Sequence, residues 1–181
     1  RPHAAGIVTT RRRTMNLVTV PGYFLHALAE LRISEVDGVG NNMRIVQYWN
    51  EARMSLKVND DETPWCAAFV GAMLYRDNVE ATRLPNARSY VNWGDEWTGT
   101  GLGAVVVLER GGNAPKWQGH VGFCAGITSS HVHVLGGNQG DRVSIAAFAR
   151  SRVLSIRQPK GVKLPASTFV LPVSSVEPKV H

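Results

Sequence analysis

The sequence predicts an α+β fold in which helices come first and a small antiparallel sheet follows. Helical spacing of apolar residues dominates up to about residue 77, whereas short β-branched or alternating runs dominate from residue 104 onward. Eighteen glycines and nine prolines indicate many turns, which a helical bundle does not need. Helices followed by strands are typical of the α+β class.

Composition limits the size, partners and location of the protein. The 181 residues fit one domain, and 44% hydrophobic with 19% charged residues is typical of a globular chain. A net charge of +6 favours an anionic partner. The basic residues are scattered apart from the run at 11–13, so we expect no nucleic-acid partner and a monomer. No apolar run is long enough to cross a membrane.

The helical half begins after a loose arm at residues 1–20. The spacing predicts a helix over 21–33, with Pro21 in its first turn. Asn41 or Asn42 is suited to cap a second helix that ends near residue 52 or 53. Because the chain starts at Arg1, either its start has been processed or a foreign segment precedes Met15.

The second half of the sequence contains the patterns of about five strands, which are predicted to form an antiparallel meander. They fall at residues 104–108, 120–127, 131–135, 143–147 and 152–156. An apolar helix from residue 64 to about 77 is expected to pack on one face of this sheet. The domain thus spans 21–159, and the proline-spaced residues 160–181 predict an extended tail.

Cys66 lies at the start of that central helix and is the candidate nucleophile. Thr63 is an acceptable N-cap and Pro64 suits the first helical position, which makes Cys66 the third helical residue. Unpaired N–H groups and the helix dipole favour a thiolate there. A buried structural cysteine is the alternative interpretation. The acidic residues at 60–62 precede the helix and oppose thiolate formation.

His120 and Asn138 are the candidate partners of this thiol. Strand alternation places His120 on the face of its strand that also carries Gly122 and Cys124. Asn138 follows the next strand, so a hairpin returns its amide to the level of His120, where it can orient the imidazole. A simple turn is the alternative for residues 136–140, and Gln139 competes for the same role.

Four segments together resemble the motifs of NlpC-type and CHAP cysteine peptidases, which are papain-like enzymes that cut peptidoglycan peptides. They are Pro64–Val70, Trp93–Gly94, Gly119–Phe123 and Leu135–Gln139. The resemblance implies a papain-like fold with Cys66 as nucleophile, His120 as base and Asn138 as the orienting residue. Trp65, Gln139 and Trp93 lie in these segments and are the further candidates for binding the oxyanion or the substrate.

The sequence departs from these families at two points. The first sheet strand often begins Gly-Asp in such proteins, but here it begins Gly103-Ala104. No glutamine shortly precedes Cys66, so the expected oxyanion donors are the backbone N–H groups of Trp65 and Cys66.

The expected function is thiol-dependent hydrolysis of amide bonds in peptidoglycan, by an endopeptidase or an amidase. No cofactor is expected, and the protein would act at the bacterial cell wall, in the periplasm or outside the cell. No clear signal peptide is present, which favours a phage lysin or another antibacterial enzyme. Two alternatives stay open. One is a non-catalytic papain-like binding module, and the other is a metal-dependent hydrolase that uses His120, Cys124, His131 and His133.

Overall fold

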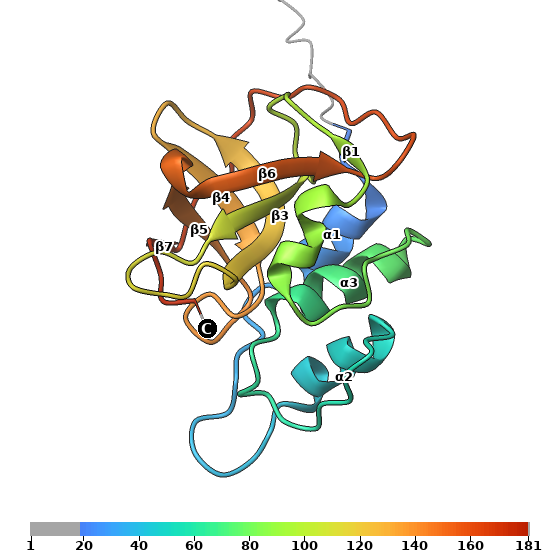
Figure 1. The fold of residues 1–181 in the computed structure, drawn as a ribbon, viewed down its shortest axis with the longest axis vertical. Helices are drawn as coiled ribbons and strands as arrows, with labels where there is room; N and C mark the ends of the chain where they lie inside the picture. Colours follow the sequence, from blue (N-terminus) through green and yellow to red (C-terminus); the bar gives the residue numbers. More distant parts are fainter. Residues whose placement is uncertain (1–18, 181) are drawn as a thin grey trace, which may run out of the picture.

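The computed structural model describes residues 19–180 and has a mixed α+β architecture, as the sequence predicts. Helices lie on one side and a sheet on the other (Figure 1). The arm predicted for residues 1–20 falls almost entirely outside the described residues.

The helical layer of the described chain comes first in the sequence. It consists of α1 (Gly22–Ala29), α2 (Met43–Glu51), α3 (Cys66–Arg76) and the 3-10 helix η1 (Ala87–Asn92). Asn42 caps α2 as predicted, because its side chain accepts a hydrogen bond from the N–H of Arg44 at 2.9 Å. The first helix is shorter than predicted: Pro21 is its N-cap, and Glu30 ends it.

The sheet of residues 19–180 has seven strands in the order β1-β6-β2-β3-β4-β5-β7. In chain order these are β1 (Asp95–Glu96), β2 (Val105–Glu109), β3 (Gly119–Ile127), β4 (His131–Gly136), β5 (Ser144–Ala149), β6 (Val153–Gln158) and β7 (Ser175–Val176). A short 3-10 helix, η2 (Arg150–Arg152), joins β5 to β6. All pairs are antiparallel except β5 with β7.

Two features of the sheet differ from the prediction. Only β2 to β5 form a meander, because β6 returns to the opposite edge and pairs with β2. The two additional strands are two-residue segments at the edges, too short to produce a visible alternation in the sequence. The C-terminal segment contributes β7, and its Val180 forms an isolated β-bridge with Gln139, so this segment is part of the folded unit.

Both faces of the sheet are covered by apolar side chains. The helix-side core joins Phe69 of α3 to Val121 and Phe123 of β3, and the rings of Phe69 and Phe123 lie 6.5 Å apart. The opposite face holds a second cluster that includes Cys124 and Phe148. Within residues 19–180 no helix combines the length and the apolar character needed to cross a membrane.

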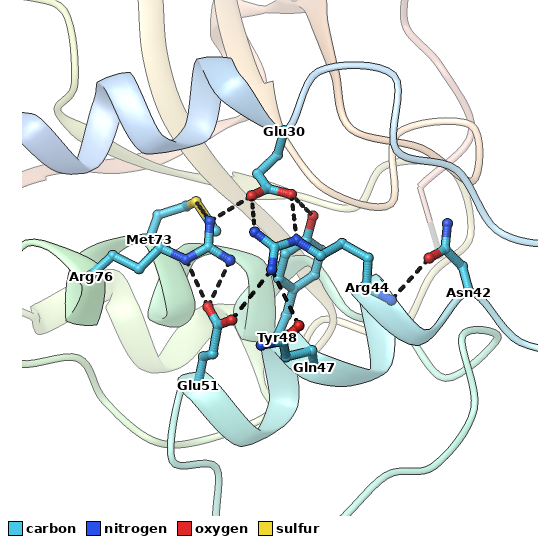
Figure 2. A network of polar contacts seen from close by, with 8 residues as sticks. All are labelled: Glu30, Asn42, Arg44, Gln47, Tyr48, Glu51, Met73 and Arg76. Carbon is cyan, nitrogen blue, oxygen red and sulfur yellow. Dashed lines mark hydrogen bonds and ion pairs between the residues drawn. The ribbon is translucent and has the colours of Figure 1, made fainter.

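A buried ionic network ties the three α-helices together (Figure 2). The carboxylate of Glu30 accepts hydrogen bonds from Arg44 and Tyr48 on α2, the latter at 2.8 Å, and from Arg76 on α3 at 2.6 Å. Glu51 pairs with Arg76 at 2.7 Å. This network fixes the orientation of α3 and therefore of the residue at its start.

Candidate active site

Cys66 is the first residue of α3, two positions nearer the helix start than predicted. Trp65 is the N-cap with φ −109° and ψ 11°, which is not helical. The first helical hydrogen bond runs from the Phe69 N–H to the Trp65 carbonyl at 2.9 Å. The N–H groups of Cys66 and Ala67 therefore precede the hydrogen-bonded ladder and are available at the helix start.

The Cys66 thiol is a free and buried group, with 3% of the residue exposed. Burial raises its pKa, while backbone hydrogen bonds from Val121, Ala67 and Cys66 itself act in the opposite direction. The net shift is upward, so the resting group is a neutral thiol. The helix start, which was expected to favour a thiolate, therefore does not outweigh burial.

Two carboxylates of the acidic run before α3 accept hydrogen bonds from backbone N–H groups of nearby loops. Asp60 accepts a hydrogen bond from the Thr63 N–H at 2.7 Å, and this bond lowers the pKa of Asp60. Asp61 is fully buried and accepts from the N–H groups of Val36 and Asn42 at 2.9 and 2.8 Å. Asp61 thus organises the loop before α2 and Asp60 the loop before α3. Burial is the main cause of the raised pKa of Cys66.

His120 lies on the second residue of β3 and is completely buried. Its ring packs against Phe148, 5.6 Å between centroids, on the side of the sheet opposite the helices. Cys66 belongs to the helix-side core. The two groups approach β3 from its two faces, and no hydrogen bond joins them among the described residues because His120 Nδ1 is buried without a partner.

The tautomer of His120 follows from Gln139. The Gln139 amide nitrogen donates to the carbonyls of Val134 and Ser144, at 3.2 and 2.7 Å, which fixes the orientation of the amide. Its oxygen therefore faces His120 Nε2, 3.0 Å away, and must accept a hydrogen bond from it. With the proton on Nε2, the unpartnered Nδ1 carries the lone pair of a general base.

Burial is the main cause that lowers the pKa of His120, to about 4. The hydrogen bond to Gln139 opposes this shift, and the charges of Arg152 and Arg110 add to it. At neutral pH the ring is therefore uncharged, and the resting site pairs a neutral thiol with a neutral imidazole.

Gln139, and not Asn138, orients the imidazole in this structure. Asn138 has a left-handed φ of 57°, which turns the chain so that the next residue points back under β4. The Asn138 side chain is completely buried, and neither its oxygen nor its nitrogen has a hydrogen-bond partner. The sequence analysis favoured Asn138 and named Gln139 as its competitor, and it is Gln139 whose amide lies within hydrogen-bond distance of His120.

Neither Trp65 nor Trp93 is among the residues that line the pocket beside Cys66. Trp65 is fully buried, packs against Gly137, and donates from its indole nitrogen to Glu35 at 2.7 Å. Trp93 packs on Tyr90 and lines a different pocket, near Pro159 and Val162. Trp65 therefore positions the loop after β4, and Trp93 has no contact with the Cys66 pocket.

A pocket of about 110 Å³ opens beside Cys66. Sequence reasoning missed most of its lining: Pro85, Asn86, Ala87, Arg110, Trp117 and Gln118, together with Pro64 and Gly119. Pro85 and Asn86 come from the loop before η1, which begins at Ala87, and Arg110, Trp117 and Gln118 come from the long β2–β3 connection. The signal available in the sequence was that Gln118 and Gly119 immediately precede His120.

The alternative metal site is not assembled. Within residues 19–180 the structure gathers no group of three or more His, Cys, Asp or Glu side chains that could hold an ion. His133 Nδ1 lies 2.7 Å from the Leu171 carbonyl and His131 Nδ1 lies 2.8 Å from the Ser130 hydroxyl, so these rings have local partners. Cys124 is buried in the second apolar cluster.

Comparison of the chain with protein-family models, with curated proteins and with solved structures finds no match. The functional interpretation therefore depends on the geometry of the site and on the resemblance of its motifs.

Proposed function

We propose that this protein is a papain-like cysteine hydrolase that cleaves amide bonds in the peptide part of bacterial peptidoglycan. The observation that carries the proposal is the placement of Cys66. Cys66 is the first residue of α3 and lines a pocket, and backbone groups of Val121 and Ala67 counteract part of the rise that burial causes in the pKa of its thiol. His120 directly precedes Val121 in β3, and its Nε2 bonds to Gln139 while its Nδ1 has no hydrogen-bond partner.

These groups support nucleophilic acyl transfer from a neutral resting pair. As the Cys66 sulfur attacks the substrate carbonyl, His120 Nδ1 takes the thiol proton and a carbon–sulfur bond forms. The oxyanion that develops is stabilised by N–H groups at the start of α3. His120 then protonates the leaving amine, the carbon–nitrogen bond breaks, and an acyl-enzyme remains.

Water completes the cycle with the same base. His120 removes a proton from water as its oxygen attacks the thioester carbon, and the carbon–sulfur bond breaks. The products are a carboxylic acid and the regenerated thiol. Catalytic hydrogen bonds that are absent in a resting enzyme often form only when substrate is bound, so the unpartnered Nδ1 is compatible with this role.

Peptidoglycan as the substrate is supported by charge and by motif order. The net charge of +6 favours association with an anionic wall. The segments around Cys66, His120 and Asn138 resemble those of peptidoglycan peptidases and occur in the same order.

The test compares the parent protein with Cys66→Ala and His120→Ala on purified sacculi, with circular dichroism to verify folding. The parent should release new amino groups and each variant should release none. Full activity of folded Cys66→Ala would overturn the proposal. Mass spectrometry of the products identifies the bond, because the new termini distinguish an endopeptidase from an amidase.

A non-catalytic papain-like binding module is the second candidate. It is favoured by the complete burial of His120 and by the lack of a hydrogen bond between His120 and the Cys66 thiol. A module would bind sacculi without releasing amino groups, and Cys66→Ala would bind them equally well. Cosedimentation measured beside amino-group release separates the two functions.

A further inference from the structure

The pocket beside Cys66 contains one charged side chain, that of Arg110, and no carboxylate. Four arginines of the described chain, Arg44, Arg76, Arg83 and Arg152, each pair with a glutamate, whereas others such as Arg88 and Arg157 bond to backbone carbonyls. Arg110 makes no such pair within residues 19–180. Its Nη1 donates to the neutral Gln118 side chain at 2.8 Å.

Gln118 and the chain around it hold Arg110 in place. The Gln118 carbonyl accepts from Arg88 Nε at 2.8 Å, so two guanidinium groups converge on this residue. The Arg110 carbonyl accepts from Arg152 at 2.6 Å, which fixes the backbone at the end of β2. A guanidinium has five N–H donors, and Gln118 engages one nitrogen of Arg110. The remaining donors can bind a ligand.

The charge of Arg110 acts on both reacting groups. It opposes the effect of burial on the pKa of Cys66, and it adds to the effect of burial on the pKa of His120. Trp117 lines the same pocket and is 64% exposed, which is unusual for so large an aromatic side chain. The pocket thus offers a cation and an exposed aromatic surface beside the nucleophile.

We propose that Arg110 binds a free carboxylate of the substrate next to the scissile amide, so that the enzyme prefers acidic wall peptides over their amidated equivalents. Planar guanidinium groups bind carboxylates through two parallel hydrogen bonds, which a carboxamide cannot accept in the same way. Trp117 covers the apolar part of the same peptide. The inference depends on the proposed function, because it specifies the substrate of that site.

A purely electrostatic role of Arg110 makes a different prediction. If its charge only favoured the thiolate, removing it would slow the cleavage of all substrates by the same factor. A binding role changes the ratio between carboxylate and carboxamide substrates. The ratio is therefore the diagnostic quantity.

The experiment uses a muramyl tripeptide with a free carboxylate on its second residue and the same peptide with that carboxylate amidated. Binding is measured by calorimetry on Cys66→Ala, and hydrolysis is measured on the protein that retains Cys66. We expect the carboxylate peptide to bind at least about 10-fold more tightly. Adding Arg110→Gln should reduce the ratio to near one. Arg83→Gln, an exposed arginine paired with Glu80, is the matched control and should leave it unchanged.

Equal binding of the two peptides, or an unchanged ratio in Arg110→Gln, would overturn the inference. If Arg110→Gln does not fold, Arg110→Met, which also removes the charge, replaces it, and an unchanged ratio in the folded Met variant has the same meaning. Selective binding without hydrolysis would refute the proposed function but support the carboxylate site. Equal hydrolysis of both peptides would support the function and refute the site.

Discussion

Replacing Glu30 with Gln should destabilise the helical layer that carries Cys66. Glu30 is 6% exposed and accepts hydrogen bonds from two arginines and a tyrosine (Figure 2). Burial alone would raise its pKa, but the bonds from Arg44, Arg76 and Tyr48 outweigh burial and lower the pKa from 4.5 to about 2. At about 1.4 kcal/mol per pKa unit, the carboxylate contributes about 3 kcal/mol to the free energy of unfolding.

The pH dependence of this contribution has a definite sign. Because the pKa is lower in the folded state, the carboxylate stabilises the fold fully above its ordinary pKa of 4.5. The contribution disappears as the pH falls from there towards about 2. The cost of Glu30→Gln should therefore be about 3 kcal/mol near neutral pH and roughly half of that near pH 3.

Urea denaturation followed by circular dichroism at both pH values measures this cost. Glu80→Gln is the matched control, because Glu80 also accepts from a tyrosine and an arginine, at 2.9 and 3.1 Å, but is exposed to solvent. Its loss should change stability little. The reasoning is refuted if Glu30→Gln costs no more than Glu80→Gln, or if its cost is the same at both pH values.

Three further predictions concern the site. The pKa of His120 is about 4 and that of Cys66 is raised, so kcat/KM should increase through about pH 4 and stay level to above neutral pH. For the same reason, iodoacetamide should react slowly with Cys66 at pH 6. Rapid alkylation at that pH would contradict a neutral resting pair. Gln139→Leu should lower kcat about 100-fold through misorientation of His120. It should also move the acidic limb of the pH profile to lower pH, because the hydrogen bond to Gln139 raises the pKa of His120 and its loss would lower that pKa. Gly137→Ala should cost about 1–3 kcal/mol in thermal unfolding, since its new methyl group would collide with Trp65.

The sequence predicted the features that depend on local chemistry. Helix α2 begins where Asn42 provides a cap, and the strands from β2 to β5 fall on the β-branched and alternating runs. Strand alternation also placed His120, Gly122 and Cys124 on one face of β3. These features need only neighbouring residues to be specified.

The errors come from tertiary contacts that a local pattern does not contain. Helix α3 begins late because the indole of Trp65 is buried beneath Gly137 and donates to Glu35, which holds the Trp65 backbone outside the helical region. The amide that binds His120 depends on the left-handed backbone of Asn138. Arg110 lies in the long β2–β3 connection, and no periodicity in the sequence predicts the course that brings this residue to the pocket.

The two faces of β3 explain why the resting site is neutral. Cys66 packs with Val121 and the helices, whereas His120 packs with Phe148 on the other face. His120 precedes the paired part of β3 and β4, which begins at Phe123. Each group is buried in its own apolar layer, and burial disfavours the charged form of both. Under the proposed mechanism, the transfer of the proton from Cys66 to His120 would therefore accompany the attack of the sulfur on the substrate carbonyl.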